Sequence, residues 1–340
     1  MAVETPPNLR PMRMGQILDQ AVRLYRNNFI AFMGIVALVQ VPIAIIQLLL
    51  NLVTVSGSDM PNLAATLSVS LFSTLLSFIF IQGVGTAAMT RAVADNYLGE
   101  KTGALEAYRK IGGGWLSLLA ALFILGLIGI VAAVWLLVPC IGWLTGLGIL
   151  AYLSLVIAPL VAPIIVLEGG SASGGWRRAW ELARQRFWWI FGFFAVLYIF
   201  NLLVVIGPST LISYILTFIW DFSGPDPNTY LISQLVIQQL VTVSLSLIFL
   251  PFQLAATTLV YFDLRVRSEG FDLVVRAQDG KGEDQVVAEL MSRAPQADQG
   301  SLITSRELGY FAGLTLIPVG LYFAFFFFLT LLFGIIEGVS

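Results

Sequence analysis

The chain has 340 residues, of which 58% are hydrophobic and 11% are charged, with a formal net charge of −2 and a mean hydropathy of +0.88. Soluble domains carry roughly 25% charged residues, so this surface is too poor in charge for water to solvate it. The charge balance gives no reason to expect a nucleic-acid partner. The chain has no histidine, which removes the most common general base and transition-metal ligand.

Seven segments are long and apolar enough to cross a membrane, which takes about 20 mainly apolar residues. They are Phe29–Val55, Leu63–Ala94, Trp115–Val138, Trp143–Leu167, Trp188–Ile206, Tyr230–Phe262 and Leu308–Ile335. Thr210–Trp220 is also apolar, but its 11 residues are too few to span, so we expect an interfacial or re-entrant helix there. The sequence therefore predicts an all-α integral membrane protein with about seven transmembrane helices.

The basic residues predict the orientation. All 18 Lys and Arg residues lie before the first span, between or at the ends of the second and third, between the fourth and fifth, or between the sixth and seventh. By the positive-inside rule we expect a protein of the cytoplasmic (inner) membrane, with its N-terminus in the cytoplasm and its C-terminus outside. The polar stretch 1–28 and the long first span do not fit a cleavable signal peptide.

Internal similarities predict a repeated unit. Ala21–Phe29 and Ala179–Phe187 both fit the pattern A-x-x-L-x-R-x-x-F, and Ala107–Trp115 is a weaker third copy. A pair of alanines stands eight residues before Asp95, and another stands eight residues before Asp263. We interpret these as about three parallel repeats, approximately 14–98, 103–168 and 174–267, each an amphipathic helix followed by a membrane hairpin.

The repeats define the predicted domains. Residues 1–270 form a membrane domain, 271–307 a cytoplasmic polar linker, and 308–335 an additional transmembrane helix. In the first amphipathic segment, Ile17, Ala21 and Leu24 share a face opposite Asp19 and Arg23, which are spaced as an i,i+4 pair. We expect such helices to lie in the headgroup plane with the apolar face toward lipid.

The candidate acidic residues stand at the ends of spans. Asp95 and Asp263 could form a paired acidic site contributed by two repeats, or each could pair with a nearby arginine, Arg91 or Arg265. Glu168 is also terminal, and the same alternatives apply to it. No catalytic, cofactor-binding or metal-binding motif is predicted, and we expect a protein that is not an enzyme.

Two further sets of residues are candidates for function. The glutamines could line a polar pathway, or they could form hydrogen bonds between helices, worth roughly 0.6–2 kcal/mol each. The arginines could contact anionic lipid headgroups, or they could only set topology. The pathway candidates are Gln82, Gln234, Gln238 and Gln253, and the headgroup candidates are Arg23, Arg26, Arg177, Arg178 and Arg184.

Four segments carry a resemblance to a known family. LDQAVRLYRNNF, TRAVADNYLGE, VLEGGSASGGWRRAWELARQRFW and PFQLAATTLVYFDLRVRSEGFDL resemble the bacterial membrane domain attached to some glycerophosphoryl diester phosphodiesterases, over roughly Met14–Leu273. The family also has stand-alone members. The phosphodiesterase itself is a separate soluble barrel that uses histidine and metal-binding carboxylates, so its activity is not implied for this chain.

These observations leave two functional hypotheses open. The first is a non-enzymatic membrane scaffold or lipid-contacting component, whose partners are membrane lipids and another membrane or cytoplasmic protein. The second is a transporter for a small molecule or lipid, which requires a polar cavity at mid-bilayer depth lined by the glutamines.

Cysteine labelling tests the predicted topology. In a Cys140→Ser background, a cysteine at Asp59 should react with a membrane-impermeant maleimide added outside intact cells, and one at Lys281 should react only after permeabilisation. The reverse pattern would contradict the orientation.

Overall fold

The computed structural model of the chain describes residues 10–56, 63–139, 141–223, 227–271 and 304–337, and this part is helical throughout, without a β-strand. The helices are α1 (Met14–Asn27), α2 (Phe29–Ser56), α3 (Leu63–Leu76), α4 (Thr86–Tyr97), α5 (Ala104–Lys110), α6 (Gly114–Trp135), α7 (Ile141–Tyr152), α8 (Ala158–Glu168), α9 (Ala172–Gln185), α10 (Phe187–Asn201), α11 (Gly207–Ser223), α12 (Pro227–Glu269) and α15 (Ser305–Glu337). Three π-helical turns interrupt the long helices: η1 (Ser77–Gly85), η2 (Leu153–Ile157) and η3 (Leu202–Ile206).

Six of the continuous helices in the described residues are long and apolar enough to cross a membrane. They are Phe29–Thr54, Thr66–Tyr97, Gly114–Trp135, Ile141–Glu168, Phe187–Ile219 and Thr229–Glu269. Each overlaps one of the first six predicted spans. The predicted seventh span falls on the helix α15, which is not among the six, and the predicted linker 271–307 lies mostly outside the described residues.

The prediction of a separate interfacial or re-entrant helix at Thr210–Trp220 is wrong. These residues belong to α11, which continues the helix begun by α10 through the π-helical turn η3. Pro208 is the second residue of α11, and the wider π turn lies just before it, where the proline ring removes a backbone donor. A Gly-Pro pair therefore does not end this helix.

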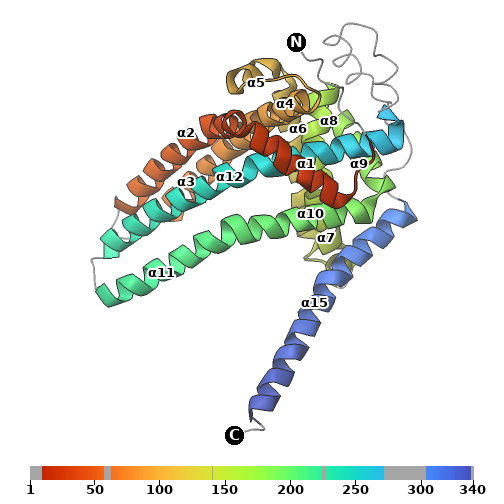
Figure 1. The fold of residues 1–340 in the computed structure, drawn as a ribbon. Helices are drawn as coiled ribbons and strands as arrows, with labels where there is room; N and C mark the ends of the chain where they lie inside the picture. The colour runs from red at the N-terminus through yellow and green to blue at the C-terminus, as the bar shows by residue number, and fades with distance from the viewer. Residues whose placement is uncertain (1–9, 57–62, 140, 224–226, 272–303, 338–340) are drawn as a thin grey trace.

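The elements follow one order three times. A short helix (α1, α5 or α9) is followed by a first long helix and then by a second long helix that returns. The second long helices end in α4, α8 and α12 (Figure 1). This order is the one that a triplicated unit would produce, although the duplication itself stays a prediction.

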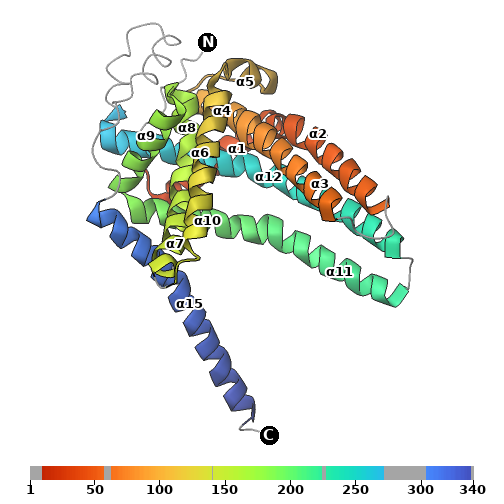
Figure 2. The same cartoon turned by 180° about the vertical axis from the view of Figure 1, so that it is seen from behind.

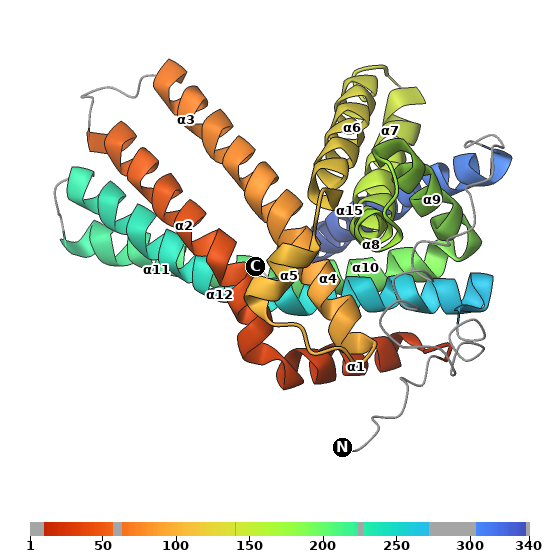
Figure 3. The ribbon, with the colours of Figure 1, turned by 90° about the horizontal axis from the view of Figure 1, so that it is seen from above.

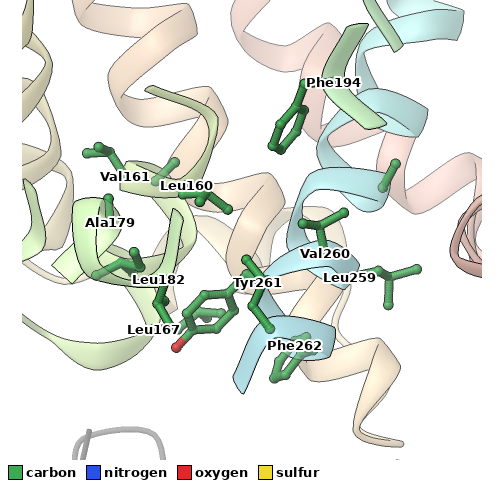
Figure 4. Packing of buried hydrophobic residues seen from close by; sticks show 14 of the residues in the cluster. Leu160, Val161, Leu167, Ala179, Leu182, Phe194, Leu259, Val260, Tyr261 and Phe262 are labelled. Carbon is green, nitrogen blue, oxygen red and sulfur yellow. The ribbon is translucent and has the colours of Figure 1, made fainter. Parts of the chain in front are cut away.

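The core lies where the ends of α4, α8 and α12 pack against one another. The repeated alanine pairs, Ala87-Ala88 and Ala255-Ala256, are fully buried, so small side chains let helices approach closely here. Figure 4 shows apolar side chains of α8, α9 and α12, among them Leu160, Ala179 and Val260, gathered in this core. We call this region the hub: α1, α4, α5, α8, α9 and residues 255–269 of α12.

Away from the hub the hairpins spread apart. Seen from above, α2, α3, α11 and the adjoining part of α12 lie on one side, and α6 and α7 lie on the other (Figure 3). Seen from behind, α15 extends away from the other helices (Figure 2). These outer portions expose large apolar side chains such as Val53, Leu71, Val131 and Leu203. Such surfaces are stable in hydrocarbon and costly in water.

The apolar faces of the short helices pack against protein, so the expectation that they face lipid is wrong. Ile17 and Ala21 of α1 are fully buried, and α1 lies along α12. Ala179 and Ala183 of α9 are likewise buried, with α9 packed on α8 and α6. A narrow apolar stripe on a short helix fits the groove of a neighbouring helix, so its side chains are covered by protein and not by lipid.

The first turns of α15 dock onto α7. The backbone amide of Gly148 donates to the Thr315 hydroxyl at 3.0 Å, and Phe311 and Thr315 are buried. A Cβ atom at Gly148 would lie 1.9 Å from the carbonyl oxygen of Phe311. Only glycine therefore permits this close approach of the two backbones.

Gly148→Ala should loosen this docking. The added methyl group must push the two helices apart, which typically costs about 1–3 kcal/mol, so the melting temperature in a fixed detergent should fall by several degrees. Gly129→Ala is the matched control, because no atom lies within 4 Å of its Cβ position. Equal melting temperatures for the two variants would contradict the docking.

Candidate functional site

Asp95, at the end of α4, is buried, and its carboxylate is bound by basic and hydroxyl side chains. Its carboxylate pairs with Arg91 at 2.9 Å and with Lys110 of α5 at 3.2 Å, and it accepts a hydrogen bond from the Thr102 hydroxyl at 2.9 Å. The predicted pairing with Arg91 is confirmed. Lys110 also pairs with Glu100, so Asp95 ties α4 to the short helix that follows it.

Asp263, at the end of α12, does not pair with Arg265 as predicted. Its side chain is buried and pairs with Arg267 at 2.8 Å, while the backbone amide of Met12 donates to its other oxygen at 2.7 Å. Arg267 also donates to the carbonyl of Met12 at 2.6 Å. Residues four apart share a helix face and residues two apart do not, which explains why Arg267 is the partner.

The remaining terminal acid, Glu168 of α8, belongs to a closed ring of buried polar groups. It lies 3.5 Å from Arg178 of α9, and the Tyr261 hydroxyl donates to it at 2.9 Å. Arg178 pairs with Glu269, which pairs with Arg265 at 2.9 Å, and Arg265 donates to the Tyr261 oxygen at 3.1 Å.

This ring contains two carboxylates and two guanidinium groups, so its charges cancel. Buried charges are stable only when they are paired and hydrogen-bonded, and here each charged group is paired. The acidic residues of the spans therefore serve the packing of α8, α9 and α12. The alternative of a paired acidic site between Asp95 and Asp263 has no support, because each is occupied by its own basic partners.

Burial, hydrogen bonds and nearby charges shift the pKa values of two groups on α5, outside the spans. Burial alone would lower the pKa of Lys110, but the hydrogen bond to Glu100 and the charge of Asp95 raise it above its ordinary value. Burial raises the pKa of Tyr108 to about 12, and its hydroxyl donates to the Ile35 carbonyl at 2.6 Å. Lys110 is thus held in its charged form and Tyr108 in its neutral form at physiological pH.

Glu307, at the start of α15, forms an ion pair with Arg184. The two are 2.6 Å apart, and the Thr304 amide donates to Glu307 at 2.8 Å. Burial opposes ionisation, but the Thr304 hydrogen bonds and the Arg184 charge bring the pKa of Glu307 below its ordinary value. This pair links α9 to α15.

The arginines predicted to contact lipid headgroups therefore differ in how accessible they are. Arg178 is buried in the ring and cannot reach a headgroup, and Arg184 forms an ion pair with Glu307. Arg177 is half-buried, whereas Arg23 and Arg26 on α1 are exposed. The expected Asp19–Arg23 ion pair is not formed among the described residues.

The predicted glutamine pathway is not assembled. Gln82 and Gln238 are exposed on the outside of the helices. Gln234 and Gln253 are half-buried and stand 19 residues apart on α12, which is about 28 Å at 1.5 Å per residue. A cavity of about 10 Å³ between the spans is lined by none of the four; it lies beside Gln40, which donates to Ser246.

A larger polar groove lies beside α1, with a volume of about 410 Å³. Its lining residues are Arg10, Met12, Gln16, Asp19, Gln20, Arg23 and Tyr97. Sequence reasoning found Arg23 but missed the rest of the site. The signal was present, since Gln16, Asp19, Gln20 and Arg23 are spaced i, i+3, i+4 and i+7, which places them on one helix face.

Within the described residues, no group of three or more His, Cys, Asp or Glu side chains could hold a metal ion. The groove is therefore defined by arginine and amide donors with one carboxylate, a set of groups suited to binding an anion.

Comparison with known proteins gives the family. A model of a domain of unknown function, DUF7847, matches residues 12–264, about three quarters of the chain. The protein therefore belongs to this family. No curated protein and no solved structure matches it.

The match lies within the predicted membrane domain and includes α1, the carboxylates Asp95, Glu168 and Asp263, and every residue that lines the groove except Arg10. It ends before Glu269 and before α15.

Arg178→Ala tests the buried ring. It leaves Glu168 and Glu269 buried without the cation that they share, and breaking a buried pair in this way typically costs about 3–5 kcal/mol. The melting temperature should fall strongly and recover in part when Glu168 is also changed to glutamine, because Glu269 then remains paired with Arg265. Arg177→Ala, one residue away, should change it little. Similar losses in both alanine variants would contradict the role of the ring.

Proposed function

We propose that this protein is a non-enzymatic component of the cytoplasmic membrane, a scaffold whose hub contacts anionic lipid headgroups on the cytoplasmic side. One observation carries the proposal. The arginines of α1 are exposed and make no ion pair among the described residues, whereas Arg91, Lys110, Arg178, Arg184, Arg265 and Arg267 are all paired with carboxylates.

The surroundings of these arginines support a place at the membrane surface. Arg23 and Arg26 lie next to Val22, which is 50% exposed, and α1 leads directly into the first span, where Ile30 is 86% exposed. Cationic residues beside exposed apolar ones are typical of helices at a headgroup boundary. Each Lys or Arg near an anionic surface contributes about 1 kcal/mol of attraction.

The short helix α5 offers a contrast. Arg109 and Glu106 of α5 are exposed, as are Lys101 and Glu100 in the segment just before it, so this surface has both signs of charge. We expect α1, and not α5, to provide the main attraction for anionic lipid.

The alternative function, a transporter for a small molecule or lipid, has less support. It requires Gln82, Gln234, Gln238 or Gln253 to line a polar cavity between the spans. Neither the small cavity beside Gln40 nor the groove beside α1 is lined by any of them.

We also propose a protein partner, either an enzyme or another membrane protein. The proposal of a partner rests on the resemblance to the membrane domain attached to glycerophosphoryl diester phosphodiesterases.

Thermal unfolding in lipid nanodiscs tests the lipid-contacting role. The wild-type protein should melt several degrees higher in phosphatidylglycerol-rich nanodiscs than in phosphatidylcholine nanodiscs, because the α1 cations gain headgroup partners. Arg23→Gln/Arg26→Gln should lose most of this difference, while the matched control Lys101→Gln/Arg109→Gln should keep it. A wild-type protein with the same melting temperature in both lipids would contradict the proposal.

A further inference from the structure

We infer that the groove beside α1 is a binding site for one phosphodiester group that carries hydroxyls, such as a glycerol-phosphate headgroup. The inference deepens the proposed function and rests on it, since it turns a general attraction for anionic lipid into one defined site. It is carried by four features of the groove: its cations, its hydrogen-bonding groups, its fixed wall and its charge balance.

The first feature is a pair of cations that line the groove. Arg23 comes from the second half of α1 and Arg10 from the segment before the helix, and both line the cavity. Both are exposed, and neither forms an ion pair with any carboxylate of the described part of the chain. Arginine presents planar, paired donors that match the oxygens of phosphate.

The second feature is the pair of side-chain amides, Gln16 and Gln20, that line the same groove. The side-chain oxygen of Gln16 accepts a hydrogen bond from the backbone amide of Arg13 at 2.8 Å, which commits the acceptor end of this side chain and leaves its NH₂ group as a donor. Gln20 lies one turn further along the same face of α1. Amide donors and guanidinium groups that line one groove suit an anion with several oxygens.

The third feature is a wall that is already in place. Met12 lines the groove, and its backbone is held from both sides by Asp263 and Arg267 of α12. Tyr97, which also lines the groove, packs against Phe262 with ring centroids 5.3 Å apart. A site whose wall is fixed before the ligand arrives loses less conformational entropy on binding.

The fourth feature is Asp19, which sets the class of anion. It lies on the same face as Gln16, Gln20 and Arg23, so the groove has two positive charges and one negative charge. A phosphomonoester dianion would be repelled by this carboxylate, whereas a phosphodiester monoanion balances the remaining positive charge. The carboxylate can also accept hydrogen bonds from hydroxyls next to the phosphate.

The volume is consistent with this ligand. About 410 Å³ exceeds the roughly 30 Å³ that one water molecule occupies by more than tenfold, so a whole headgroup fits. The groove lies beside α1, the helix that leads into the first span, so a lipid in the membrane could present its headgroup there.

Native mass spectrometry of the full-length protein in a neutral detergent tests the inference. Phosphatidylglycerol, its deacylated headgroup glycerophosphoglycerol, phosphatidic acid and phosphatidylcholine are each titrated. We expect saturable one-to-one binding of phosphatidylglycerol, of glycerophosphoglycerol, or of both, and weaker binding of the other two. Binding of both locates recognition in the headgroup; binding of only one identifies the source as a lipid or as a soluble phosphodiester.

Variants then connect binding to the groove. Arg10→Gln and Arg23→Gln should each weaken the phosphodiester at least tenfold. Arg109→Gln is the matched control, since Arg109 is exposed on another short helix, α5, and does not line the groove, and it should change binding less than twofold. Asp19→Asn should raise the affinity for phosphatidic acid and remove the preference for the diester.

Two results would overturn the site. One is the absence of saturable binding of either phosphodiester, and the other is an equal loss in Arg109→Gln and Arg23→Gln. If the nanodisc stabilisation by anionic lipid persists in either case, the proposed lipid contact stands without a defined site. If that stabilisation is absent as well, both proposals fail.

Discussion

A buried carboxylate at the end of a long helix needs a cation and hydrogen-bond donors, and the hub is organised around that need. Asp95 finds its partners in α4 and in the next short helix, α5; Glu168 finds one in the next short helix, α9; and Asp263 holds the segment that leads into α1. The third link connects the last unit back to the first. The three units are therefore closed into a ring by polar contacts at one end of the molecule, and the contact between Asp263 and Met12 also fixes the wall of the groove.

The two parts of the molecule differ in what stabilises them. In the hub, small residues such as Ala87 and Ala255 bring helices together, and ion pairs connect the short helices to them. In the outer portions, the hairpins diverge and their large apolar side chains are exposed. Those surfaces are compatible with lipid as the surrounding solvent. The polar groove lies in the hub, apart from these apolar outer portions.

Sequence patterns predicted the features that depend on local spacing. Hydropathy located the six candidate spans, and the predicted pair of Asp95 with Arg91 is formed. For Asp263 the prediction named Arg265, whereas the i,i+4 spacing explains why the partner is Arg267. Contacts between segments far apart in the sequence could not be predicted from these patterns. Nothing in the periodicity of α1 says that Ile17 is covered by α12 rather than lipid, or that Arg178 meets both Glu168 and Glu269. The groove was missed for the same reason, because Tyr97 is 74 residues from Arg23.

The contacts by which Asp95, Glu168 and Asp263 close the three units into a ring are central to the structure, and hydrogen–deuterium exchange of the full-length protein in nanodiscs tests them most directly. Asp263→Asn, Glu168→Gln and Asp95→Asn each remove one link. Faster exchange is expected mainly in the segment leading into α1 for Asp263→Asn, in α9 for Glu168→Gln and in α5 for Asp95→Asn, because each acid holds the short helix of the next unit. Faster exchange confined to the helix that carries the substitution, or spread evenly over the hub in all three variants, would contradict the ring.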